Sequence, residues 1–184
     1  MLSQEQIIRA QKLARGEWQR DLIRYGSDTL RGTASHWRGT YETSIENFAR
    51  RLNKAGIPAR AMRFGYTFYL IVGDEWVQLC DRLDKLIAEI NEVRVDQIQD
   101  LIRRYPAVTK WLSKTKIMSQ LRLLLYRCSE TLQDIGIWNQ GAKEYLLRGD
   151  EESAKAEFAH AAERVERLEQ EWRNLQKQVV LLFL

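Results

Sequence analysis

The chain is poor in residues that break helices and in residues that build disulfide or metal sites. Among its 184 residues are two prolines and ten glycines, with only two cysteines and two histidines. Cys80 and Cys128 each lack a second cysteine or histidine at ligand spacing, so we expect neither a zinc site nor a disulfide framework. Scarce proline, combined with abundant leucine, alanine, glutamate, arginine and glutamine, favours long helices over a β-sandwich.

Long apolar runs and familiar catalytic motifs are also missing. No segment approaches the ~20 apolar residues of a membrane helix, and the N-terminus lacks the apolar core of a secretion signal. We therefore expect a cytoplasmic protein without a membrane span. No nucleophile elbow, Walker loop or dinucleotide fingerprint occurs, and neither His36 nor His160 lies within a helical turn of a cysteine or aspartate in the sequence. The sequence predicts no catalytic, cofactor-binding or metal-binding residues, and hence a non-enzymatic protein.

What the sequence does contain is helical periodicity. Apolar residues recur every three or four positions over residues 3–25, which predicts one helix. Asp28 is expected to cap a second helix that ends at Gly56. The short link at Gly26 and Ser27 would fold these two helices into an antiparallel hairpin.

The period changes from about 3.6 to 2 over residues 57–72, which predicts a β-hairpin with a two-residue turn at Gly65 and Tyr66. In that register Ala59 lies opposite Val72. One face of the hairpin should rest on a helix, while the other is apolar enough to need a second cover or a partner. The open edge of the hairpin is a further expected contact for a partner.

Three more helices are predicted after the hairpin. Asp74 is expected to cap one that continues to residue 105, and the next should run from about residue 108 to 148. Gly136 and Gly141 are expected to bend or interrupt that helix. Asp150 then marks the start of the last one.

The last helix has the most regular pattern in the chain, a four-three repeat of apolar residues. This repeat predicts a coiled-coil helix that pairs either with the preceding helix or with another chain. The apolar C-terminal end is expected to be an association surface. The predicted interface residues are Val165, Leu168, Trp172, Leu175, Val179, Leu182 and Phe183.

Positive charge is concentrated in residues 101–129, which hold seven basic and no acidic side chains. One interpretation is contact with a polyanion, and the other is pairing with the acidic last helix. Arg122, which the helical projection places on the apolar side, would then be satisfied by a carboxylate of that helix. The predicted polyanion-binding residues are Arg103, Arg104, Lys110, Lys114, Lys116 and Arg127.

Together these patterns predict a mainly α fold: a multi-helix bundle of long helical hairpins, with a coiled-coil-like C-terminal helix and one small inserted β-hairpin. Residues 1–106 would form a helical hairpin, the β-hairpin and the third helix, and residues 107–184 a long antiparallel helical hairpin, unless the two form one continuous domain. The expected function is a subunit or adaptor for protein–protein assembly or self-association. The alternative is a nucleic-acid-associated helical subunit of a ribonucleoprotein or DNA-processing complex that contacts the phosphate backbone.

Overall fold

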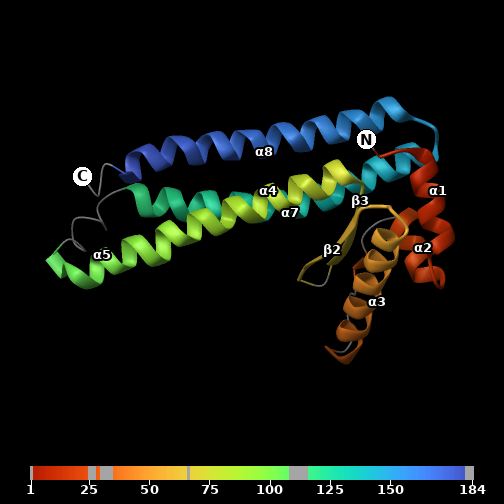
Figure 1. Cartoon of the computed structure of the whole chain (residues 1–184), viewed down its shortest axis with the longest axis horizontal. Coiled ribbons are helices and arrows are strands. Elements are labelled where there is room, and N and C mark those ends of the chain that lie inside the picture. The colour runs from red at the N-terminus through yellow and green to blue at the C-terminus, as the bar shows by residue number, and fades with distance from the viewer. Residues whose placement is uncertain (1, 25–27, 30–34, 66, 108–115, 181–184) are drawn as a thin grey trace. The chain divides into compact units, whose positions relative to one another are not determined.

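A computed structural model describes residues 2–24, 28–29, 35–65, 67–107 and 116–180, without the side chains of residues 28, 29, 35–41, 95, 96 and 180. The fold is mainly α with one small antiparallel β-hairpin, as predicted (Figure 1). Its described helices are α1 (Gln4–Leu13), α2 (Glu17–Arg24), α3 (Ser35–Lys54), α4 (Asp74–Asn91), the π-helix η1 (Glu92–Gln97), α5 (Ile98–Arg104), α7 (Lys116–Leu147) and α8 (Glu151–Val180). None of these helices combines the length and apolarity that crossing a membrane requires.

The chain divides into two compact units that do not follow sequence order. Unit 1 comprises Met1–Cys80 and Gln133–Ala162, and unit 2 comprises Asp81–Leu132 and Glu163–Leu184. Helices α4, α7 and α8 each contribute residues to both units. The sequence-based boundary at residue 106 stays a prediction.

The single N-terminal helix predicted over residues 3–25 is wrong. It is broken between α1 and α2 at Gly16, whose φ of +83° is a left-handed conformation that favours glycine. The Gln19 side chain accepts a hydrogen bond from the Arg15 N–H at 2.8 Å and so supports the break. The start of α1 matches its prediction, since Ser3 and Gln6 form a reciprocal capping box.

The expected role of Asp28 as a helix cap is also wrong. Asp28 and Thr29 form β1, which pairs antiparallel with Phe68 and Thr67 of the hairpin. Helix α3 begins later, at Ser35. The predicted link between the first two helices at residues 26–27 lies outside the described residues.

The β-hairpin and its register are confirmed. Strands β2 (Ala59–Phe64) and β3 (Thr67–Val72) pair antiparallel with Ala59 opposite Val72, and the sheet order is β1-β3-β2. Gly65 in the turn has a φ of +60°, which explains why glycine is needed there.

Both faces of the hairpin are covered by the chain itself. On one face Phe68 is fully buried and meets the Trp18 ring edge-on, with ring centroids 6.4 Å apart. On the other face Tyr69 lies against Gly136 of α7, where an added Cβ would come within 2.5 Å of the Tyr69 ring. The second cover predicted from the sequence is therefore α7. Gly136 and Gly141 do not interrupt α7, which is continuous from Lys116 to Leu147.

Two asparagines extend the sheet at the open end of the hairpin. Asn53 of α3 exchanges two hydrogen bonds of 2.8 Å with the backbone N–H and C=O of Ala59. Asn139 of α7 does the same for Val72, at 3.0 and 2.9 Å. Because a side-chain amide reproduces the donor and acceptor of a peptide group, both edges are already paired at this point. A partner strand could not add there without displacing an asparagine.

Lys143 of α7 completes this edge. Its side chain is buried, and Nζ donates to the Leu70 carbonyl at 2.7 Å and to the Leu22 carbonyl at 3.2 Å. Burial lowers the pKa of Lys143 from 10.5 to about 7. One lysine thus ties α2 to the edge of β3.

The remaining helices follow the prediction with small differences. Asp74 is the first residue of α4 rather than its cap, because the first helical hydrogen bond runs from Val77 N–H to the Gly73 carbonyl. The helical phase continues through η1 into α5, although η1 has π-helical hydrogen bonding. Asp150 marks the start of α8 as expected, and Asp150 is its cap, since its carboxylate accepts from the Ser153 N–H at 3.0 Å.

Candidate protein-binding surface

The apolar face of α8 in unit 2 is buried within the chain. Five of the seven predicted interface residues lie on it, and Leu182 and Phe183 fall outside the described residues. In this structure the face packs inside the protein, although Leu175 and Val179 also line grooves at the surface. The five buried residues are Val165, Leu168, Trp172, Leu175 and Val179.

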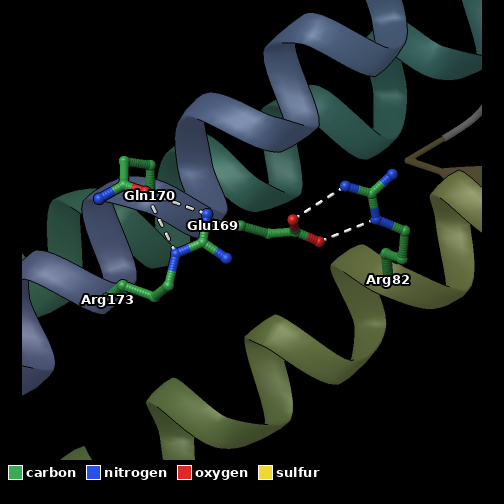
Figure 2. Close-up of polar contacts among 4 residues, drawn as sticks. All are labelled: Arg82, Glu169, Gln170 and Arg173. Carbon is green, nitrogen blue, oxygen red and sulfur yellow. Dashed lines mark hydrogen bonds and ion pairs between the residues drawn. The ribbon is translucent and has the colours of Figure 1, made fainter.

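Charge-assisted hydrogen bonds hold α8 to α4 in unit 2. Figure 2 shows Arg82 of α4 and Glu169 of α8 joined by two parallel bonds of 2.8 Å each. This bidentate geometry is the strongest form of arginine–carboxylate pairing, and the bonds from Arg82 lower the pKa of Glu169. The Trp172 indole N–H donates to the Glu89 carboxylate at 3.0 Å. Both contacts fix the rotation of α8 about its own axis.

A second ion pair joins α8 to the basic segment of α7. Arg127, one of the predicted polyanion-binding residues, contacts Glu171 at 2.5 Å. The pairing between the basic segment and the acidic last helix therefore exists at Arg127. The expected burial of Arg122 is wrong, because its side chain is exposed.

Three of the other five predicted polyanion-binding residues lie within the described part of the chain. Arg103 and Lys116 are exposed, and Arg104 is exposed but pairs with Asp100 at 2.8 Å. Lys110 and Lys114 lie outside the described residues.

The outer face of α7 in unit 2 carries two exposed apolar side chains. Leu123 is 57% exposed and Tyr126 is 65% exposed. On the opposite side of the helix Leu121, Leu124 and Cys128 are buried. Leu123 and Tyr126 lie three residues apart and so project from the same face. A leucine and a tyrosine this exposed on one helix face are typical of a contact surface.

A groove between α7 and α8 adjoins Leu123. It has a volume of about 280 Å³, and the Arg127–Glu171 ion pair forms part of its wall. Three leucines line its apolar part, Leu123 and Leu124 from α7 and Leu175 from α8. Its remaining wall is made of amide side chains, namely Gln120, Asn174 and Gln178. Leu123, Tyr126 and this groove together are called the α7 surface below.

The sequence-based interpretation missed Leu123 and Tyr126. Its helical stripe for this segment passed through the buried face and left the other apolar residues unassigned. The signal was present, because five of the six residues from 121 to 126 are apolar, which is more than one face of a helix can bury.

Neither His160 nor Cys128 belongs to a catalytic or metal-binding arrangement among the described residues. His160 is exposed and meets the Trp138 ring edge-on, with ring centroids 4.8 Å apart, and the His36 side chain is outside the described residues. Burial raises the pKa of the Cys128 thiol to about 11, which keeps it protonated. No cluster of three potential metal ligands occurs among the side chains described here.

Comparison of the chain with protein-family models, with curated proteins and with solved structures finds no match.

Proposed function

We propose that this protein is a non-enzymatic helical subunit or adaptor that binds a protein partner through the α7 surface. The observation that carries the proposal is the exposure of Leu123 and Tyr126 beside a groove floored by Leu124 and Leu175. Burying these apolar side chains on association would contribute about 25 cal/mol per Å² removed from water.

The groove favours an amphipathic helix as the partner element. Its lining spans about two turns of each of two helices, from Gln120 to Arg127 on α7 and from Glu171 to Gln178 on α8. A third helix laid between two others buries a stripe of residues spaced by three and four. The amide side chains and the ion pair at the groove would form the polar rim that such interfaces have.

Photo-cross-linking in cells that make the protein tests this proposal. A photoreactive phenylalanine derivative at position 126 replaces one aromatic ring by another and should capture the partner in covalent form. The same residue at Glu166, which is exposed on α8, is the control position. We expect a product at position 126 whose partner peptides are identified by mass spectrometry. Equal or weaker cross-linking from position 126 than from position 166 would contradict the proposal.

A second candidate function, contact with the phosphate backbone of a nucleic acid, has its own supporting observation. Arg103 and Lys116 are exposed and have no carboxylate partner among the described residues. Elsewhere in unit 2, Arg173 and Lys177 line a wide groove of about 950 Å³ between η1 and α8. Exposed cations without a carboxylate partner, such as Arg103 and Lys116, attract polyanions with an affinity that falls steeply with salt.

Electrophoretic or anisotropy titration with nucleic acid at several salt concentrations distinguishes this candidate. We expect weaker binding and a flatter salt dependence when glutamine replaces Arg103, Arg104, Lys114 and Lys116 together. The control variant removes four exposed positive charges elsewhere, with glutamine in place of Lys12, Arg20, Lys54 and Lys85. It should change the affinity and the salt dependence much less. Absence of retention of single- or double-stranded nucleic acid at low salt by the unmodified protein would remove this candidate.

A further inference from the structure

The exposed stripe of α7 in unit 2 has a charge pattern centred on Tyr126. Arg122 lies four residues before Tyr126 and Glu130 four residues after it, and both side chains are exposed. Neither makes an ion pair with another described residue. They are eight residues apart on one helix, or about 12 Å at 1.5 Å per residue, too far to pair with each other.

This pattern is self-complementary under a two-fold rotation. When two copies of the helix pack antiparallel with Tyr126 at the centre, Arg122 of each copy faces Glu130 of the other. Leu123 then lies opposite Ser129, a small exposed residue that leaves room for it. Parallel packing would instead oppose like charges, Arg122 to Arg122 and Glu130 to Glu130.

We propose that the partner of the α7 surface is a second copy of this chain, bound in an antiparallel, two-fold symmetric dimer centred on Tyr126. The inference rests on the proposed function, because it names the partner of that same surface. Closed two-fold dimers are the commonest soluble oligomers, and a self-complementary patch is what their symmetry requires. The two ion pairs set the register and orientation, and the apolar side chains at the centre supply the area removed from water.

Charge reversal gives a sharp test of this geometry. In Arg122→Glu alone, two glutamates oppose each other at both ends of the dimer, and in Glu130→Arg alone, two arginines do. Each single variant should dimerise at least about tenfold more weakly than the unmodified protein, since two attractive pairs become repulsive. Both positions are exposed, so far-UV circular dichroism should show unchanged helix content.

Rescue distinguishes the antiparallel dimer from any other effect of the substitutions. An equimolar mixture of the two single variants restores both opposite-charge pairs and should dimerise as the unmodified protein does. The double variant, with Arg122→Glu and Glu130→Arg in one chain, should also regain the dimer. Sedimentation velocity over a hundredfold range of concentration measures all of these species.

Three results would overturn the inference. They are a monomeric unmodified protein at every concentration, single variants that dimerise like the unmodified protein, and a mixture that stays monomeric. If one of these results appears while the residue at position 126 still cross-links to a different protein, the dimer is refuted and the proposed adaptor function stands. If position 126 captures nothing, both proposals fall.

Discussion

At the scale of single residues, Lys143 is the most unusual feature of the molecule. It is 1% exposed, and among the described residues its Nζ bonds to the two carbonyl oxygens of Leu22 and Leu70 and to no carboxylate. A neutral amine has two N–H groups, which matches these two acceptors. Taking an ammonium group out of water is costly, and this cost is why burial lowers its pKa to about 7.

This environment predicts a pH dependence of stability. Between about pH 7 and 10.5, Lys143 is increasingly neutral in the folded protein while it remains protonated in the unfolded chain. The unfolded state then binds more protons, so the free energy of unfolding should rise with pH across this window. Below about pH 7 the lysine is protonated in both states and contributes no further slope.

The measurement is urea denaturation at pH 7, 8 and 9, compared with Lys143→Met. One pKa unit corresponds to about 1.4 kcal/mol. The unfolding free energy of the unmodified protein minus that of the variant should therefore rise by roughly that order per pH unit. Other groups that titrate in this range cancel in the difference. A constant difference from pH 7 to 9 would show that Lys143 does not titrate in the folded protein.

At the scale of elements, the two glycines within α7 have different environments and should respond differently to alanine. At Gly136 an added Cβ would come within 2.5 Å of the Tyr69 ring, which is held between the sheet and the helix. At Gly141 the atom nearest to an added Cβ would be Oε1 of the flexible Glu157 side chain, at 3.3 Å. The helix is the same in both cases, so intrinsic propensity favours alanine equally at the two sites.

We therefore predict that Gly136→Ala lowers the stability and that Gly141→Ala does not. Overpacking against Tyr69 should cost about 1–3 kcal/mol net of the gain in propensity. At Gly141 the carboxylate end can move, and the variant should be neutral or more stable by up to about 1 kcal/mol. Thermal or urea unfolding measures both, and a Gly136→Ala protein as stable as the parent would show that α7 does not press on the sheet as described.

The elements that the sequence predicted correctly are those with strong local signals. The hairpin register follows from alternation around a glycine turn, and the start of α8 follows from an aspartate cap. The break at Gly16 was missed because a glycine within a helical pattern does not reveal its φ, and apolar spacing continues across it. Strand β1 was missed because two residues are too short to show a period, and its pairing depends on distant Phe68.

The candidate surface was harder to predict than the fold. A buried seam and an exposed contact face are both apolar in sequence, and only packing decides which is which. Trp172 was expected on an interface and is buried inside unit 2, whereas Tyr126 had no assigned role and is exposed. The charges around Tyr126 can be recognised as part of an exposed face only once the opposite face of α7 is known to be buried.

At the scale of the whole molecule, the chain has two kinds of apolar helix face, and they should respond differently to substitution. The α8 face that contains Trp172 is buried within the chain, and the Trp172 indole N–H is hydrogen-bonded to Glu89. The α7 surface around Tyr126 is open to solvent. Substitution of the first should change folding stability, and substitution of the second should change association.

Trp172→Asp and Tyr126→Ser should therefore have different effects. An aspartate at position 172 would leave a cavity and a buried charge close to Glu89, at a cost of about 3–5 kcal/mol. That is a large part of the 5–15 kcal/mol that ordinarily stabilises a domain. The loss should appear in the thermal midpoint extrapolated to the dilute, monomeric protein. Trp172→Phe, which keeps an aromatic ring but loses the bond to Glu89, should cost only about 1 kcal/mol.

Tyr126→Ser should show the converse behaviour, with the thermal midpoint of the monomer unchanged and the sedimentation coefficient at high concentration reduced. The two variants are compared over a hundredfold range of protein concentration, because a folding defect is independent of concentration and an association defect is not. If Trp172→Asp instead gave a smaller species with full helix content, the α8 face would be an interface between chains. The pairing of Trp172 with Glu89 inside unit 2 would then not describe the protein in solution.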